Sequence, residues 1–271
     1  MTTQSAATVP LPKPSIDDLA NAIRNRELTL NYQPIINMKT KVVDGFEALM
    51  RWKHPVMGNI SPGIFIPLAE ESGLIIEASK WALREACRAL KRIEGRTGHD
   101  SSLYMSVNFT PRDFTEDTFI FDLYNIISES DVMPEQIQLE ITEKLMLTQP
   151  DNALSSLTMC RKAGMKISVD DCATSQMDLS YLSKYPIDSV KIDQIYIRKI
   201  LTDPESARLV NWIVKTAQVM GKVAIAEGIE TVEEEQALLN AGCVDAQGYL
   251  YARPLPEKEV TDFLLKSPLK T

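Results

Sequence analysis

Short runs rich in β-branched and aromatic residues alternate along this chain with longer amphipathic segments. The runs predicted as strands are 28–35, 42–52, 103–109, 136–142, 166–170, 189–192, 223–226 and 246–251. The clearest predicted helices are 79–93, 115–128, 152–163, 207–220 and 232–241, and Gly164, Gly221 and Gly242 stand where helices stop. Repeated strand, helix, strand order predicts parallel strands joined by helical crossovers.

The first two predicted strands break this alternation. Only about six residues separate 28–35 from 42–52, which is too few for a crossover helix, so this pair is expected to be antiparallel. The predicted fold class is therefore α/β, a modified TIM (β/α)8 barrel with one antiparallel strand. An open doubly wound sheet is the alternative. The chain has 271 residues, of which 44% are hydrophobic, and this is enough to bury one such core.

The domain organisation follows from composition at the N-terminus. Residues 1–14 are rich in Thr, Ser, Ala and Pro, and we predict that they form a flexible leader. Ser15 is expected to cap a first helix that runs to Arg26, with Asp17 and Asp18 in its first turn. A barrel domain is predicted over 15–271.

Charge and cysteine content restrict the classes of function. There are 37 acidic and 29 basic residues, and the net charge is -8, which disfavours binding of duplex nucleic acid. A small phosphate ligand remains compatible with this charge if metal ions lie between the carboxylates and the phosphate. The four cysteines (87, 160, 172 and 243) form no CxxC pair, so neither a zinc site nor a disulfide framework is indicated, and a reducing cytoplasm is expected. No apolar run is long enough to cross a bilayer.

Polar residues stand near the carboxyl end of almost every predicted strand. They are Glu47, Asn108, Glu140, Asp170, Asp171, Lys191, Glu227, Glu230 and Gln247. In a barrel these ends face one shared mouth, where this fold builds its sites. Strand periodicity places Glu140 toward the mouth and its neighbours Leu139 and Ile141 toward the helices.

Several carboxylates at one mouth cannot all stay ionised without cations, because like charges raise one another's pKa. Glutamate, asparagine and aspartate oxygens suit Mg²⁺ or Mn²⁺, and a second ion bridged by Asp170 and Asp171 would complete a two-metal phosphodiester site. Lys191 could orient a nucleophilic water. Taken singly, each residue is more often a helix cap or a rim ion pair. Asp170 and Asp171 could start a helix, and Lys191 could extend to solvent. The segment Gln-Gly-Tyr at 247–249 could be a plain turn before an edge strand. Their recurrence at strand after strand favours a site.

With these residues in view, the chain resembles the EAL family of cyclic di-GMP phosphodiesterases over nearly its whole length. The sequence Glu47-Ala48-Leu49 lies within Gly-Phe-Glu-Ala-Leu-Met-Arg-Trp at 45–52. In order there follow Val-Asn at 107–108, Leu-Glu-Ile-Thr-Glu at 139–143, Asp-Asp at 170–171, Lys-Ile-Asp at 191–193, Ala-Glu-Gly-Ile-Glu-Thr at 226–231 and Ala-Gln-Gly-Tyr at 246–249. Such an ordered series is far more specific than three letters alone.

The resemblance implies a role for each matching residue. Glu47, Asn108, Glu140 and Asp170 would hold one metal ion, Asp170 with Asp171 the other, and Glu230 is added to the metal set. Lys191, Glu227 and Glu47 form the implied catalytic group, while Gln33, Leu49, Arg51 and Gln247 would contact the ligand and Glu143 would support the loop after the aspartate pair. The implied reaction hydrolyses cyclic di-GMP to linear pGpG with Mg²⁺ or Mn²⁺, in a homodimer.

The loop at 172–178 departs from the family pattern Asp-Asp-Phe-Gly-Thr-Gly-Tyr-Ser-Ser-Leu, because Ala173 and Ser175 replace its two glycines. Each replacement would cost on the order of 1 kcal/mol where the backbone needs positive φ. Three hypotheses follow: an active hydrolase, favoured because every matching ligand is retained; a weak or inactive cyclic di-GMP receptor that signals through a protein partner; and a scaffold that binds no nucleotide.

Overall fold

Eight strands close into a barrel in the computed structural model, which describes residues 13–98, 103–172 and 181–266. They are β1 (Leu28–Asn37), β2 (Val43–His54), β4 (Tyr104–Phe109), β5 (Ile137–Thr142), β6 (Lys166–Cys172), β7 (Ser189–Ile192), β8 (Val223–Ala226) and β9 (Asp245–Ala246). Of the leader predicted at 1–14, residues 1–12 lie outside the described residues. The loop predicted to depart from the family pattern lies outside them from residue 173 to 178.

The strand directions confirm the modified barrel. Strand β1 pairs antiparallel with β2 on one side and with β9 on the other, whereas β2 and β4 to β9 all pair parallel in sequence order. The short first connection therefore produces one reversed strand. Two further strands, β3 (Gly58–Ile60) and β10 (Leu255–Pro256), extend the sheet beside β2 and β1.

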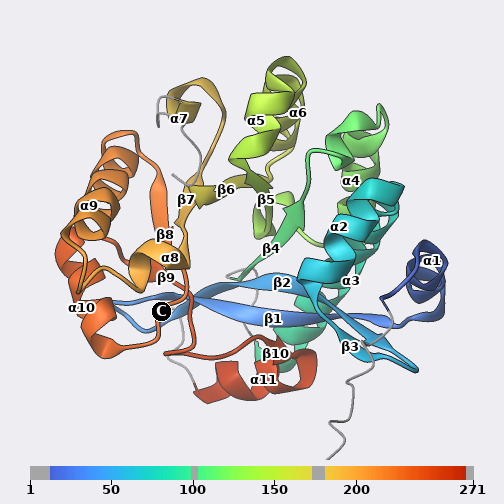
Figure 1. Cartoon of the computed structure of the whole chain (residues 1–271), viewed down its shortest axis with the longest axis horizontal. Coiled ribbons are helices and arrows are strands. Elements are labelled where there is room, and N and C mark those ends of the chain that lie inside the picture. The colour runs from blue at the N-terminus through green and yellow to red at the C-terminus, as the bar shows by residue number, and fades with distance from the viewer. Residues whose placement is uncertain (1–12, 99–102, 173–180, 267–271) are drawn as a thin grey trace, which may run out of the picture.

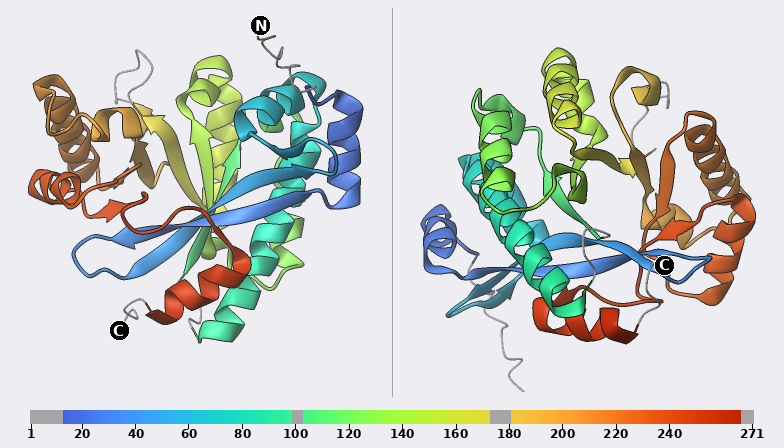
Figure 2. Two further views of the ribbon diagram at one scale, coloured as in Figure 1. Left: turned by 60° about the horizontal axis from the view of Figure 1, so that its bottom comes forward. Right: turned by 180° about the vertical axis from the view of Figure 1, so that it is seen from behind.

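Helices surround the barrel, as Figures 1 and 2 show. They are α1 (Ile16–Asn25), α2 (Pro62–Ser72), α3 (Ile75–Thr97), α4 (Phe119–Ser128), α5 (Glu143–Thr148), α6 (Pro150–Lys162), α7 (Tyr181–Lys184), α8 (Gln194–Ile197), α9 (Pro204–Val219), α10 (Val232–Ala241) and α11 (Glu257–Lys266), with short 3₁₀ turns at Asp113–Thr115 and Pro134–Gln136. Most of their apolar faces pack on the outward residues of the strands, among them Val107, Leu139 and Ile141, in one large core, while α1 and α2 pack in a second, smaller cluster around Trp52. None of the described helices is both long and apolar enough to cross a membrane.

Local sequence signals account for several helix ends. Ser15 caps α1: its hydroxyl accepts the Asp18 backbone N–H at 3.1 Å, and the Asp18 carboxylate accepts the Ser15 N–H at 2.9 Å. Gly164, Gly221 and Gly242 all have positive φ just after α6, α9 and α10, as predicted. None of the four cysteines forms a disulfide with another described residue, and all four are buried.

Two predicted elements are corrected. The strand predicted at 246–251 ends at Ala246, because Gln247 and Gly248 turn against Ile229: the Ile229 N–H donates to the Gln247 carbonyl at 3.3 Å, and a Cβ on Gly248 would lie 2.2 Å from the Ile229 oxygen. The helix predicted from residue 115 begins only at Phe119, because a 3₁₀ turn and a bend intervene. Helix α3 is longer than predicted by about a turn at each end, and α2, α5 and α11 were not predicted.

Candidate active site

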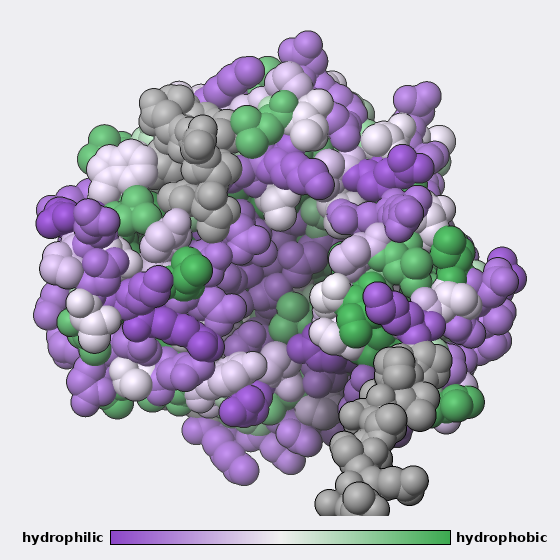
Figure 3. Space-filling model, viewed as in Figure 1, coloured by the Kyte–Doolittle hydropathy of each residue, from purple (hydrophilic) through white to green (hydrophobic). Residues whose placement is uncertain are grey.

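Most of the predicted site residues lie on or directly after parallel strands of the barrel, usually toward the carboxyl end, whereas Glu47 lies before the middle of the long strand β2. Glu47 lies on β2, Asn108 on β4, Glu140 on β5 and Lys191 on β7, while Glu227 directly follows β8. Because neighbouring parallel strands are in register, Asn108 lies beside Glu140 in the sheet. The closed sheet thus collects at one mouth side chains that are far apart in sequence. Figure 3 shows hydrophilic residues gathered in a hollow near the centre of the face in view.

The ammonium group of Lys191 lies at the centre of this cluster and is fully buried. Its Nζ is 2.7 Å from Glu227 Oε1, 2.9 Å from Glu47 Oε2, 3.0 Å from Glu140 Oε2 and 3.8 Å from Asp170 Oδ1. The alternative in which Lys191 extends to solvent is therefore wrong. One buried cation instead holds four carboxylates together, which is the arrangement that a buried charge requires.

Two amide side chains complete the network around Glu47. Asn108 Nδ2 donates to Glu47 Oε1 at 2.8 Å, and Gln247 Nε2 donates to Glu47 Oε2 at 2.7 Å and to Glu227 Oε1 at 3.1 Å. The Oε1 atom of Gln247 is buried and has no hydrogen-bond partner in the part of the chain that the structure describes. An acceptor is thus left over beside the carboxylates.

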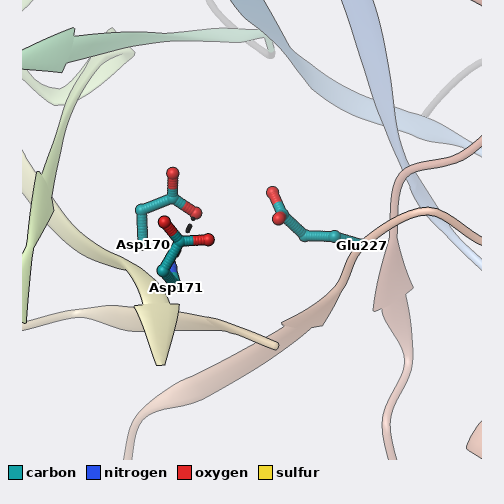
Figure 4. Close-up of side chains that lie close together, drawn as sticks. All are labelled: Asp170, Asp171 and Glu227. Atoms are coloured by element: carbon teal, nitrogen blue, oxygen red, sulfur yellow. Dashed lines mark hydrogen bonds between the residues drawn. The ribbon is translucent and has the colours of Figure 1, made fainter. Parts of the chain in front are cut away.

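Asp170 and Asp171 both lie on β6, so the alternative in which they start a helix is wrong. The pairing of β6 with β7 shifts between Val169 and Cys172, and Asp171 has φ +53°. Its N–H donates to Asp170 Oδ1 at 3.0 Å. Asp170, Asp171 and Glu227 each offer one carboxylate oxygen, and these three atoms lie within 4.8 Å of one another. Figure 4 shows the three side chains close together.

The electrostatics of the cluster are those of crowded, buried carboxylates. Burial, with Asp170 and Glu47 nearby, raises the pKa of Glu227 to about 8 despite the opposing charge of Lys191. Burial and the Asp170 charge raise the pKa of Asp171 to about 6. Burial and Glu47 also raise the pKa of Glu140 well above its usual range. One ammonium group therefore does not compensate all of these carboxylates.

Glu47 is the exception within the cluster. Burial opposes its ionisation, but Lys191 and the amide donors of Gln247 and Asn108 together lower the pKa of Glu47 to about 2. Because Glu47 is held ionised by three partners, it supplies a permanent negative charge at the mouth.

The donor set fits divalent metal ions. It consists of carboxylate oxygens and the amide oxygens of Asn108 and Gln247, and Gln247 Oε1 is buried with no partner among the described residues. Hard oxygen donors of this kind suit Mg²⁺ or Mn²⁺ rather than softer metals. Burial, together with neighbouring carboxylates, raises the pKa of Glu227 and of Asp171, and a bound divalent cation would favour the ionised form of both.

Two cavities meet at the cluster. One, of about 430 Å³, extends toward Pro62, Ile66 and Pro111, and the other, of about 290 Å³, extends toward Gln33 and Tyr249. Both are lined by the same four residues: Glu47, Leu49, Arg51 and Asp170. Gln33, Leu49 and Arg51, the residues predicted to contact the ligand, therefore all lie beside the carboxylates.

Neither Glu230 nor Glu143 is among the four carboxylates that contact Lys191. Glu230 is at the rim, where its Oε1 accepts a hydrogen bond from Arg198 at 2.7 Å. Glu143 is buried at the start of α5. The metal role of Glu230 and the loop-supporting role of Glu143 both stay predictions.

The sequence interpretation missed Arg198 and Ser106. Arg198 follows α8 and lines the smaller cavity, and no spacing rule connects it to Glu230. Ser106 donates to Glu140 Oε1 at 2.6 Å. The period of two along β4 could have found Ser106, since it lies two residues before Asn108 on the same face.

Comparison with known proteins gives the same identification. The EAL domain model matches residues 16–254. MucR of Pseudomonas aeruginosa, a bifunctional diguanylate cyclase/cyclic di-GMP phosphodiesterase, is 34% identical over 246 residues, which cover 90% of this chain and 36% of MucR. The cyclic di-GMP phosphodiesterase PdeR of Escherichia coli is 34% identical over 239 residues, covering 88% of this chain and 36% of PdeR. The chain thus spans little more than a third of either relative.

Solved structures agree in fold. The EAL enzyme Bd1971, in its cAMP- and cyclic-di-GMP-bound form, has a TM-score of 0.87 and 35% identity, covering 92% of this chain and 67% of that one. The PaMucR phosphodiesterase in complex with c-di-GMP has a TM-score of 0.86 and 33% identity, covering 90% of this chain and 98% of that one. Since the family model matches nearly all of the barrel with its one reversed strand, this chain belongs to the EAL domain family.

Proposed function

We propose that this chain binds cyclic di-GMP at the barrel mouth and, with two divalent metal ions, hydrolyses one of its phosphodiester bonds to give linear pGpG. Relatives that are 34% identical are named as cyclic di-GMP phosphodiesterases, which supports this choice of substrate. The observation that carries the proposal is the convergence of Glu47, Glu140, Asp170 and Glu227 on the buried ammonium of Lys191.

The metal ions would be Mg²⁺ or Mn²⁺, held by Glu47, Asn108, Glu140, Asp170 and Asp171. Bound there, they would neutralise phosphate charge and provide a nucleophilic water at neutral pH. The side chains of the protein supply the rest: Gln247 and Asn108 fix the orientation of the Glu47 carboxylate. Lys191, 2.7 Å from Glu227, positions the water and holds a positive charge near the reacting phosphate.

The paired cavities support a ligand with two similar halves. Leu49 and Arg51 line both cavities, so one nucleotide could lie in each while the phosphates pass the carboxylates. Arg51 is suited to a phosphate or a guanine edge, because its guanidinium presents a planar set of donors.

Nucleotide product analysis tests the proposal. The protein is incubated with cyclic di-GMP and Mg²⁺ or Mn²⁺, and the nucleotides are separated by chromatography. We expect pGpG with the wild type and at least roughly 10³-fold slower turnover with Glu47→Ala, which removes several kcal/mol of transition-state stabilisation. Intact cyclic di-GMP under every divalent ion tried would contradict hydrolysis.

Calorimetry with cyclic di-GMP separates the remaining alternatives. Binding without turnover would favour the receptor that acts through a protein partner, which the altered sequence of the loop at 172–178 keeps open. Absence of binding would leave only the scaffold. We also propose a cytoplasmic homodimer, on the family resemblance, and analytical ultracentrifugation tests the dimer.

A further inference from the structure

A second set of polar side chains lies inside the barrel, one step deeper than the mouth. Ser106, Gln138, Ser168 and Ser189 each precede a site residue by two positions on β4, β5, β6 and β7, and all four are at most 3% exposed. Because side chains alternate along a strand, these residues share the inward face with Asn108, Glu140, Asp170 and Lys191. The function described so far uses none of them.

Three members of this set form a chain of hydrogen bonds that ends on Glu140. Ser106 Oγ donates to Glu140 Oε1 at 2.6 Å, and Gln138 Nε2 donates to Ser106 Oγ at 3.3 Å. Ser189 Oγ lies 3.5 Å from Gln138 Oε1, at the limit of a hydrogen bond. Because Gln138 donates to the Ser106 oxygen, the hydroxyl proton of Ser106 is left to point at the carboxylate.

The two oxygens of Glu140 consequently have different tasks. Oε1 is bound from below by Ser106, whereas Oε2 is 3.0 Å from Lys191 Nζ and belongs to the mouth. A hydroxyl bonded to one oxygen of a carboxylate restricts its rotation and so fixes the direction of the other oxygen.

We propose that Ser106 is a positioning residue for the metal site, which orients Glu140 so that Oε2 is directed into the mouth, where a divalent ion would bind, with Gln138 holding Ser106 in turn. This inference rests on the proposed function, in which Glu140 is one of the residues that hold the metal ions. It adds a residue that touches neither metal nor substrate but sets how tightly the metal is bound.

Ser168 provides a matched control inside the same barrel. Ser168, like Ser106, is a serine with 0% exposure. It lies on β6, directly beside Glu140 of the neighbouring strand β5. Its hydroxyl nevertheless has no hydrogen-bond partner among the described residues. Replacing Ser106 or Ser168 by alanine therefore removes the same atom from the same layer, and only one change removes a bond to Glu140.

The test is a calorimetric titration of metal-stripped protein with MnCl₂, without nucleotide. We expect Ser106→Ala to weaken Mn²⁺ binding by roughly 10- to 100-fold, the range found when a group that orients a metal ligand is lost. Ser106→Thr, which keeps the hydroxyl, should recover most of the affinity, and Ser168→Ala should bind as the wild type does. Thermal unfolding in EDTA checks that each variant is folded. If Ser106→Ala does not fold, Gln138→Met, which removes the donor to Ser106, should weaken binding in the same direction.

The outcomes are distinguishable. Wild-type affinity in Ser106→Ala would overturn the inference while leaving the proposed function intact. Equal losses in Ser106→Ala and Ser168→Ala would also overturn it, because they would reflect the loss of any interior hydroxyl. A wild-type protein that takes up no Mn²⁺ would remove the proposed function and this inference together.

Discussion

The two faces of the barrel strands carry opposite chemistry, and β5 shows the contrast within six residues. On its inward face, Gln138 and Glu140 join a hydrogen-bonded polar network with Ser106 and Lys191. On its outward face, Leu139 and Ile141 pack in the continuous core beneath the helices. Both faces are buried, so burial alone does not distinguish the functional surface from the stabilising one. The inward face is the unusual one, since most barrels of this type fill their interior with branched apolar residues.

In this fold the outward face of the strands mainly supplies stability, and the inward face carries the candidate site. Outward residues gain free energy by removing apolar surface from water, and their contribution does not depend on ligands. The inward carboxylates are held by one ammonium group and by hydrogen bonds, and burial together with neighbouring carboxylates raises the pKa of Glu140 and of Glu227. The inward face should therefore respond to metal ions, and the outward face should not.

The largest expected effect comes from removing the central cation. Lys191→Met leaves four contacting carboxylates without their buried partner, which should lower the free energy of unfolding by about 3–5 kcal/mol in EDTA. Saturating Mn²⁺ should reduce this loss, because divalent ions supply the missing positive charge. Urea unfolding with and without Mn²⁺ measures both quantities.

Lys166→Met is the matched control for this change. Lys166 also lies on the barrel lining, but its ammonium stacks over the Tyr104 ring, 5.1 Å from the centroid, and none of the four carboxylates around Lys191 is its partner in the described ion pairs. Lys166→Met should lower the free energy of unfolding only slightly, and by the same amount with and without Mn²⁺. A Lys191→Met defect of equal size in EDTA and in Mn²⁺ would break the proposed contrast between the two faces.

An outward truncation should behave in the opposite way. Leu139→Ala, on a side chain that is 1% exposed, should lower the free energy of unfolding by about 2–5 kcal/mol through lost burial and the cavity left behind. We expect the same loss with and without Mn²⁺ in denaturant melts, and unchanged Mn²⁺ affinity of the folded protein. A marked dependence of the loss on metal would show that the two faces are coupled.

Asp113 is a buried carboxyl group outside the mouth. Burial raises the pKa of Asp113 from 3.8 to about 6, against hydrogen bonds from the Thr110 backbone and hydroxyl. The folded protein therefore retains a proton that the unfolded chain releases. The contribution of this retained proton to the free energy of unfolding is fully present below about pH 4. It is lost as the pH rises through about 6.

Asp113→Asn removes this titration. Relative to wild type, the variant should gain up to about 3 kcal/mol of unfolding free energy between pH 4 and pH 7. Unfolding curves of both proteins across that pH range measure the difference, and subtracting them cancels titrations that the two proteins share. A difference that is constant with pH would show that Asp113 does not change protonation on folding.

The reversed first strand, most strand positions and most side chains of the mouth could be predicted from the sequence. The short link between β1 and β2 excludes a crossover, and the period of two places Glu140 inward and Leu139 outward, so these features follow from local rules. Contacts made only in the folded barrel bury Lys191 among four carboxylates, favour the turn over the strand at Gln247, and bond Ser106 but not Ser168 to Glu140. These contacts join different strands, and their geometry depends on how the barrel closes and staggers, which no pattern within a single strand encodes.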